Sequence, residues 1–167
     1  MTLEALNDLE PVALKEALRT CCGSSVWAEN MVVLFPVTDP STLFAAAVEI
    51  WRNCSEKDWR EAFTHHPKIG DIEGLKKKFA ATEAWASAEQ SGTGSASLEV
   101  LEALAKGNRI YEEKFGYIFI VCATGKSAAE MLGLLRERLG NEPEEEILIA
   151  MGEQEKITRL RLEKLLS

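Results

Sequence analysis

The sequence predicts an all-α fold, a single-domain multi-helix bundle over residues 1–167 with one buried extended segment at about residues 117–123. Apolar residues recur at three- and four-residue spacing along most of the chain, which is typical of amphipathic helices. Capping residues precede most of these stretches, and Gly or Pro follows them. Only one stretch reads as a strand, and a lone strand has no partner to pair with. The length of 167 residues suits one domain.

The N-terminal part is expected to form four helices, each with a recognisable start. A proline in the first turn or a Ser or Asp at the N-cap marks these starts. Ser55 with Asp58 forms a capping-box pattern. The helices are expected over residues 10–22 and 26–35, from Asp39-Pro40 onwards, and from Ser55 to the histidine pair at 65–66.

The rest of the chain is expected to be helical around one flexible connector. Residues 91–97, Ser-Gly-Thr-Gly-Ser-Ala-Ser, form that connector, which could be an active-site loop or, as the composition favours, a simple link. Ser127 is a candidate N-cap, and Gly140 stands where the same helix ends. The helices are expected over residues 72–80, 83–90, 98–115, 128–139 and 142–166. The apolar face of the last helix is expected to consist of Ile147, Ala150, Met151, Ile157, Leu160 and Leu165.

Residues 117–123, Tyr-Ile-Phe-Ile-Val-Cys-Ala, form a continuous apolar run with aromatic and β-branched residues. Propensity favours an extended, buried conformation for such a run. Its backbone donors and acceptors must still be satisfied. We therefore expect a buried extended segment between helices that offers backbone groups to another part of the protein or to a ligand.

Composition excludes several classes of partner. The net charge is −8, from 27 acidic and 19 basic residues, which argues against a nucleic-acid surface and against an anionic membrane surface. No apolar run reaches the ~18 residues of a membrane span, and the acidic N-terminus has no signal-peptide pattern. The four cysteines form no CxxC pair, so reduced thiols and a cytoplasmic location are expected.

Metal and cofactor motifs are missing as well. His65 and His66 are neighbours that cannot both face one ion, and no HExxH pattern is present. Residues 123–127, Ala-Thr-Gly-Lys-Ser, resemble the end of a phosphate-binding loop, but Ile120 stands where that loop requires glycine. We therefore expect no metal ion and no organic cofactor.

His65 and His66 are the only histidines of the chain, and they stand where a helical pattern stops. The residue before a proline is disfavoured in the α region, so Pro67 should direct His66 away from His65. Histidine is the proton-transfer group best matched to neutral pH. His66 could line a pocket, or the pair could simply place a favourable cation at a helix C-terminus.

Two further sets of residues can be interpreted in two ways. Glu89, followed by Gln90, could orient an imidazole or share its proton, or the pair could be solvated at a helix end. Arg159 and Arg161 lie two positions apart on a helix and must face different ways. One of them could clamp a planar anion in a pocket, or both could form surface ion pairs.

Several ordered motifs together resemble the 2-oxo-4-hydroxy-4-carboxy-5-ureidoimidazoline (OHCU) decarboxylase family. The resemblance covers nearly the whole chain. Several motifs in the same order are more specific than any one of them. The segments that carry it are His66 to Gly70, Glu89-Gln90, Asn108 to Tyr111, Lys114 to Ile120, Arg136 to Leu139, Lys156-Ile157 and Leu160 to Leu162.

The resemblance implies an all-α homodimer that acts without a cofactor on a small ureidoimidazoline, producing (S)-allantoin in urate breakdown. It implies that His66 is the catalytic proton-transfer group and Glu89 its acidic partner. The resemblance implies that backbone groups of the segment from Phe115 to Ile120 bind the substrate. The full set of substrate-binding residues that it implies is Pro67, Gln90, Tyr117, Phe119, Ile120 and Arg161.

The chain departs from the family pattern at three places. Leu34-Phe35-Pro36 replaces an Arg-Pro-Phe sequence, and Phe115 to Phe119 replaces Phe-Gly-Phe-Pro-Phe. Ala86 stands where the family often has a serine, with Ser87 beside it. Two other functions stay open on the residues alone: a non-enzymatic helical interaction module, and a cofactor-free hydrolase or isomerase of a related ureide.

Overall fold

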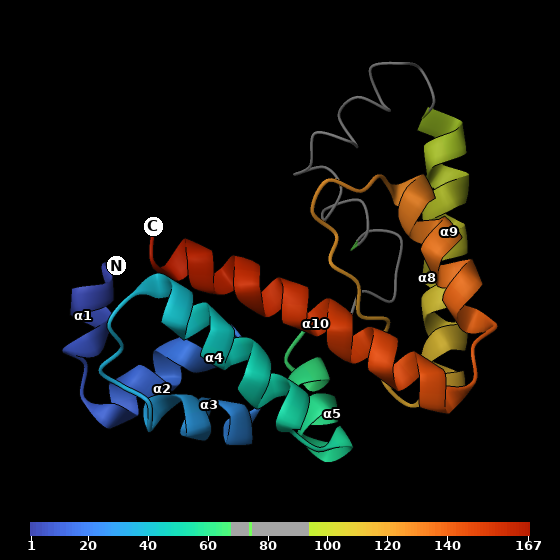
Figure 1. Ribbon diagram of the computed structural model, residues 1–167. Helices are drawn as coiled ribbons and strands as arrows, with labels where there is room; N and C mark the ends of the chain where they lie inside the picture. The colour runs from blue at the N-terminus through green and yellow to red at the C-terminus, as the bar shows by residue number, and fades with distance from the viewer. Residues whose placement is uncertain (68–73, 75–93) are drawn as a thin grey trace. The chain divides into compact units, whose positions relative to one another are not determined.

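The computed structural model describes residues 1–67, Gly74 and residues 94–167, with only the backbone described for residues 94–97. Every regular element within these residues is a helix (Figure 1), which confirms the all-α prediction. Contacts divide the chain into two compact units, residues 1–66 with 151–167, and residues 67–150. The expected single domain over residues 1–167 stays a prediction. The helices predicted over residues 72–80 and 83–90 fall outside the described residues, except for Gly74, which is helical.

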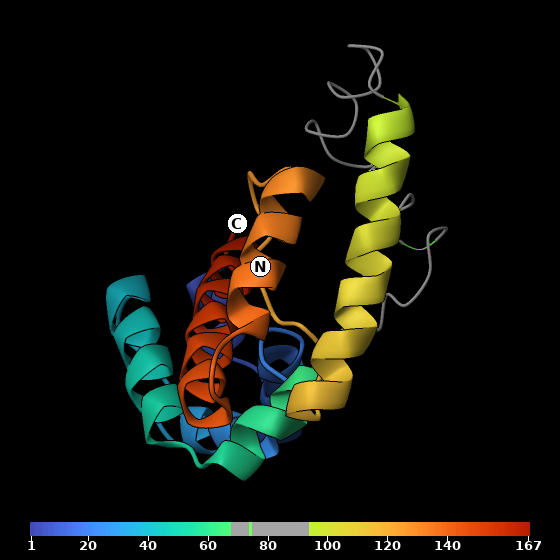
Figure 2. The same ribbon diagram turned by 90° about the vertical axis from the view of Figure 1, so that its right-hand side faces the viewer.

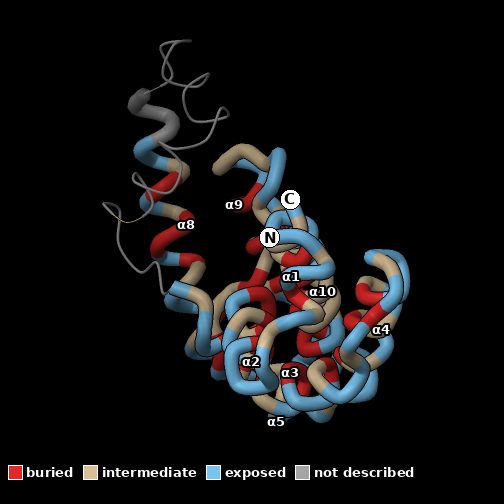
Figure 3. Tube along the Cα trace, turned by 90° about the vertical axis from the view of Figure 1, so that its left-hand side faces the viewer, coloured by how far each residue is buried: buried red, intermediate tan, exposed pale blue. Residues whose placement is uncertain are grey.

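The first unit consists of short amphipathic helices and the second half of a long one. Its buried residues alternate with exposed ones along each helix (Figure 3), as expected for helices with one apolar face. None of the described helices is long and apolar enough to cross a membrane. The helices are α1 (Leu3–Asn7), α2 (Pro11–Arg19), α3 (Ser25–Val32), α4 (Pro40–Asn53), α5 (Glu56–Thr64) and α10 (Pro143–Leu165) from Met151 onwards.

Side-chain caps begin the helices at the predicted positions. Ser24, Asp39 and Ser127 each accept a hydrogen bond from the backbone N–H three residues further on. Ser55 and Asp58 form a reciprocal capping box at the start of α5. Each cap satisfies a backbone donor that has no partner inside the helix. These local signals therefore fix where four of the helices begin.

Buried tryptophans connect the helices of the first unit. Trp27 Nε1 donates to the Ala47 carbonyl at 3.0 Å, which joins α3 to α4. Trp51 Nε1 donates to the Met151 carbonyl at 2.9 Å, which joins α4 to α10. Both rings are fully buried, so each combines a large apolar contact with a satisfied polar atom.

The second unit contains α8 (Gly94–Phe115), α9 (Ala128–Leu139) and α10 up to Ala150. α8 and α9 lie side by side and run in the same direction (Figures 1 and 2). A Cβ atom on Gly107 would lie 2.6 Å from the Leu135 side chain, so glycine permits close packing there. Near the ends of the two helices, Lys114 Nζ donates to the Leu139 carbonyl at 2.6 Å.

The parallel course of α8 and α9 explains the extended segment between them. The chain must travel back along the first helix before the second can begin, and an extended chain covers that distance in few residues. Residues 118–123 form neither helix nor strand, and Tyr117, Ile120 and Cys122 are buried. The prediction of a buried extended segment between helices is confirmed.

The structure corrects the predicted start of the long helix. α8 begins at Gly94, so residues 94–97 are helical and are not part of a flexible connector. The expectation of a connector up to Ser97 depended on small polar residues and glycine. Ser and Ala are compatible with a helix, and each residue added to a formed helix gains a hydrogen bond.

The buried face of the last helix also differs from the prediction. The apolar face was expected to include Ile157 and Leu160, but Leu160 is 41% exposed. The second half of α10 instead buries Gln154, Thr158 and Leu162. Two of these residues are polar, so hydrophobicity alone could not identify the face. Their polar atoms are satisfied by hydrogen bonds to one another and to neighbouring residues.

Candidate functional site

The end of α5 presents His66 in a position set by local sequence. His65 is the C-cap of α5 and keeps helical torsion angles, φ −83° and ψ −3°. The His66 amide still donates to the Phe63 carbonyl at 3.3 Å. Pro67 then disfavours continuation of the helix. His66 thus lies just beyond a helix C-terminus and is half-buried.

The two histidines have different partners, as the proline argument predicts. His65 is exposed, and its Nε2 atom lies 3.3 Å from Arg19 Nη2. His66 Nε2 lies 2.5 Å from Gln154 Oε1 on α10. One imidazole therefore faces a guanidinium on α2, and the other faces a buried amide.

The His65 ring also packs directly on Gly23. A Cβ atom added there would lie 2.4 Å from His65 Cγ and 2.6 Å from His65 Cβ. We expect Gly23→Ala to destabilise the protein by about 1–3 kcal/mol, the usual cost of overpacking. His65→Gly removes both the ring and the Cβ atom, so Gly23→Ala should cost much less stability in a His65→Gly background, measured by urea unfolding. An equal cost of Gly23→Ala in both backgrounds would show that the His65 side chain is not the obstacle.

Gln154 is the residue that meets His66, and it is completely buried. Its Nε2 atom donates to Thr158 Oγ1 at 3.0 Å. Thr158 lies four residues further along α10, on the same face, and is 4% exposed. A continuous row of polar atoms therefore runs from the imidazole into the core of the first unit.

Thr158 in turn reaches the thiol of Cys22. Burial raises the pKa of Cys22 to about 12, and hydrogen bonds from the Ser24 backbone and the Thr158 hydroxyl oppose this rise. At the other contact of this hydroxyl, Thr158 Oγ1 accepts from Gln154 Nε2 at 3.0 Å.

The raised pKa of Cys22 predicts alkaline destabilisation. The unfolded thiol titrates near its ordinary value of 9.0, and the folded thiol titrates near 12. The Cys22 thiol thus makes its full contribution to the free energy of unfolding below pH 9, and this contribution is lost as pH rises towards 12. Stability should fall by about 1.4 kcal/mol per pH unit over that range from this group alone. Urea unfolding of Cys22→Ala should show a correspondingly smaller slope, and equal slopes would contradict the assignment.

Arg161 extends the same face of α10. It follows Gln154 by seven residues, about two turns or about 10 Å along the axis. Its side chain is half-buried, and its charge opposes the burial that raises the pKa of Cys21. Within the described part of the chain, no residue forms a hydrogen bond or ion pair with its guanidinium. This half-buried cation is therefore available to an anionic or carbonyl ligand.

Arg159 behaves differently, as the spacing predicted. Its Nε atom donates to Glu163 at 2.6 Å, and its guanidinium lies 4.0 Å from the centre of the Phe44 ring. It is exposed. Arg159 is therefore a surface ion-pair residue, and Arg161 is the candidate ligand-binding arginine.

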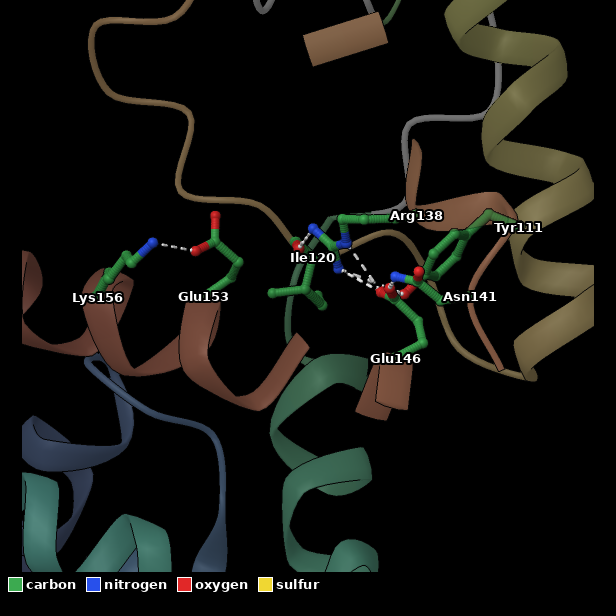
Figure 4. A network of polar contacts seen from close by, with 7 residues as sticks. All are labelled: Tyr111, Ile120, Arg138, Asn141, Glu146, Glu153 and Lys156. Atoms are coloured by element: carbon green, nitrogen blue, oxygen red, sulfur yellow. Dashed lines mark hydrogen bonds and ion pairs between the residues drawn. The ribbon is translucent and has the colours of Figure 1, made fainter. Parts of the chain in front are cut away.

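In the second unit, a buried ion pair holds the extended segment (Figure 4). Arg138 Nη1 donates to the Ile120 carbonyl at 2.7 Å, and its guanidinium lies 4.4 Å from the centre of the Phe119 ring. Arg138 Nη2 lies 2.6 Å from Glu146 Oε2, with 8% and 0% of the two side chains exposed. The Ile120 carbonyl is thus already used by the protein.

Tyr111 and Asn141 complete the arrangement around Glu146. The Tyr111 hydroxyl donates to Glu146 Oε2, and Asn141 Nδ2 donates to Oε1 at 3.1 Å (Figure 4). Burial raises the pKa of Tyr111, and the bond to Glu146 raises it further. The carboxylate of Glu146 therefore accepts from three side chains, which offsets its burial.

The backbone amides of the extended segment have a different role from its carbonyls. Among the described residues, none accepts a hydrogen bond from the amide of Phe119 or of Ile120. Phe119 also makes an edge contact with Tyr111, with ring centres 5.2 Å apart. The segment is thus fixed through its side chains and through the carbonyls of Ile120, Cys122 and Ala123, and the amides of Phe119 and Ile120 have no acceptor among the described residues.

The described residues include some, but not all, of the predicted site residues. The first unit brings His66 to a polar row on α10 whose face continues to Arg161. The second unit contains Pro67, which is exposed, and Tyr117, Phe119 and Ile120. Glu89 and Gln90 lie outside the described residues. Their roles, and the assembly of all these residues around one ligand, stay predictions.

Two important features were not predicted as parts of the site. Gln154 and Thr158 interrupt an otherwise apolar helical face at a spacing of four residues, and this was the available signal. Arg138 and Glu146 stand on different helices, and their pairing depends on the tertiary fold. No local pattern could have joined them.

Comparisons with known proteins identify the family. The sequence profile described as OHCU decarboxylase matches residues 7–163. The chain is 41% identical over 152 residues to the uric acid degradation bifunctional protein TTL of Arabidopsis thaliana, covering 89% of this chain and 46% of that protein. It is 38% identical over 104 residues to the OHCU decarboxylase of Amia calva, covering 60% and 57%. The chain thus spans about half the length of these curated relatives.

A solved structure agrees with the sequence matches. A crystal structure of OHCU decarboxylase in the presence of (S)-allantoin superimposes with a TM-score of 0.72 and 40% identity, covering 91% of this chain and 97% of that one. A crystal structure of (S)-allantoin synthase, at 21% identity and a TM-score of 0.72, shares the fold. From the profile match and these relatives, the chain belongs to the OHCU decarboxylase family.

Proposed function

We propose that this protein decarboxylates OHCU to (S)-allantoin in urate degradation, without a cofactor. One observation carries the proposal beyond family membership. His66, half-buried at the end of α5, lies against the fully buried amide of Gln154 on α10. The same face of α10 continues to Arg161, which has no ion-pair partner among the described residues. Such a face supplies a proton-transfer group and an anion-binding group.

The reaction requires little covalent help from the protein. The substrate has a carboxylate and a hydroxyl on carbon 4, beside a carbon–nitrogen double bond at carbon 5. When the bond to the carboxylate breaks, CO2 leaves and its electron pair forms a double bond between carbons 4 and 5. The pair of the carbon–nitrogen double bond moves to the ring nitrogen, which takes a proton from solvent. The hydroxyl then loses its proton as the carbonyl forms, and carbon 5 gains a proton. Positioning and proton transfer are therefore the main tasks.

Each predicted residue has a role in this scheme. Arg161 binds an anionic or carbonyl edge of the substrate through its planar fork of donors. His66 exchanges a proton with the substrate hydroxyl. Glu89 sets the protonation of the imidazole or helps to protonate carbon 5 on one face. The amides of Phe119 and Ile120 donate to a carbonyl of the substrate, and Pro67, Gln90 and Tyr117 contribute further contacts.

Freshly prepared OHCU tests the proposal directly. It decays spontaneously, so the enzyme should both accelerate loss of CO2 and produce optically active allantoin. Circular dichroism of the product would detect the S enantiomer. A racemic product at the rate of buffer alone would overturn the proposal and favour a non-enzymatic helical module. Consumption of substrate without decarboxylation would indicate a hydrolase or isomerase.

We also propose that the protein forms a homodimer and acts in the cytoplasm. Membership of the family supports the dimer, and four free cysteines support a reducing compartment. Light scattering should give twice the subunit mass of 18.5 kDa. A mass equal to one subunit at micromolar concentration would contradict the dimer.

A further inference from the structure

We infer that Gln154 is a positioning residue that holds His66 as the tautomer protonated on Nε2, so that proton exchange takes place at Nδ1. The inference rests on the proposed function for its catalytic meaning. Its structural content depends only on the hydrogen bonds around Gln154. These bonds form a chain in which the donor of each can be assigned.

The orientation of the Gln154 amide is the first step. A buried amide must use its NH2 group as donor and its oxygen as acceptor. The two neighbours of Gln154 are Thr158 Oγ1, at 3.0 Å, and His66 Nε2, at 2.5 Å. Gln154 Nε2 donates to Thr158 Oγ1, and Gln154 Oε1 is the atom that lies next to His66 Nε2. The NH2 group of Gln154 therefore faces Thr158, and its oxygen faces His66.

The tautomer of His66 follows from this orientation. An amide oxygen only accepts, so His66 Nε2 must bear a hydrogen. In a neutral imidazole the other nitrogen then lacks a proton. Nδ1 is thus the atom that takes up a proton as a base and releases it as an acid. Gln154 is completely buried, so water cannot replace this contact without entering the core.

His65 provides a matched control within the same chain. Its Nε2 atom faces Arg19 Nη2 at 3.3 Å, and a guanidinium can only donate. His65 Nε2 must accept, which places the proton of the neutral ring on Nδ1. The two adjacent histidines are therefore expected to be opposite tautomers.

Side-chain 15N NMR of the full chain labelled on histidine tests the inference without any substrate. At pH 8, His66 should show a protonated Nε2 and an unprotonated Nδ1, and His65 the reverse pattern. His65→Gln would assign the signals. A His66 ring protonated on Nδ1 alone would overturn the inference, whatever the activity of the protein. Absence of decarboxylation with the expected tautomers would instead overturn the proposed function.

Two substitutions then test the role of Gln154 in the reaction. Gln154→Met keeps the length of the side chain but removes the acceptor, so kcat should fall about 100-fold with KM nearly unchanged. Gln154→Glu keeps an acceptor for Nε2–H and should retain the tautomer, while its charge moves the acidic limb of the pH–rate profile to higher pH. Unchanged kcat in Gln154→Met, with the His65 signals intact as evidence of folding, would contradict the positioning role.

Discussion

Replacing His66 by glutamine is expected to abolish decarboxylation while the protein stays folded. Glutamine retains a polar group that can meet Gln154, so the buried amide keeps a partner. It cannot exchange a proton near neutral pH. Loss of a general acid–base group lowers kcat by about 10²–10⁴-fold. The measurement is steady-state turnover of fresh OHCU, with circular dichroism to confirm folding.

His65→Gln is the matched control for that experiment. The two residues are adjacent, but His65 is exposed and contacts Arg19 and Gly23. Its replacement should leave turnover within about threefold of wild type, because no step of the reaction is assigned to it. Near wild-type turnover in His66→Gln, or complete loss in His65→Gln, would show that the catalytic assignment is wrong.

The largest loss of stability is expected from breaking the buried pair of Arg138 and Glu146. Glu146→Leu leaves a buried guanidinium without its carboxylate, and also removes the acceptor of Tyr111. Loss of one partner of a buried ion pair costs about 3–5 kcal/mol. Urea unfolding should show this as a large decrease in the midpoint.

Two comparisons separate the pair from other effects of the substitution. Adding Arg138→Met to Glu146→Leu removes the unpaired charge and should recover part of the loss, although the Ile120 carbonyl stays without its donor. Glu163→Gln breaks the exposed pair with Arg159 and should cost less than about 1 kcal/mol. A similar cost for Glu163→Gln and Glu146→Leu would contradict the importance of burial.

The buried pair also has a consequence for the site. Arg138 holds the Ile120 carbonyl and lies over the Phe119 ring, so it fixes the segment whose amides are assigned to the substrate. The parallel packing of α8 and α9 requires this segment to be extended. The extended conformation therefore connects the two parallel helices and leaves the amides of Phe119 and Ile120 without an acceptor among the described residues.

The sequence predicted features that depend on local chemistry. The caps at Ser24, Asp39, Ser55 and Ser127 are where the sequence placed them, because a cap needs only a side chain and a backbone N–H three residues away. The divergence of His65 and His66 also followed from one local rule about proline. The extended segment was predicted because its continuous run of apolar, aromatic and β-branched residues differs from the amphipathic pattern of the neighbouring helices.

Features that depend on tertiary contacts were missed. Gln154 and Thr158 are polar residues on a buried helix face, and their hydrogen bonds to one another and to His66 offset the cost of burying them. Leu160 was expected to be buried but is exposed, because this polar row occupies the buried side of α10. Hydrophobic periodicity cannot show which buried polar side chains will form hydrogen bonds with one another.

The most direct test of the central claim is the enantiomeric composition of allantoin formed from fresh OHCU in D2O, with wild-type protein and with His66→Gln. Wild type should give the S enantiomer with one deuterium on the ring carbon that bears the ureido group. His66→Gln should give a racemate at the rate of buffer alone. A racemate from wild type, or rapid formation of the S enantiomer by His66→Gln, would contradict the claim.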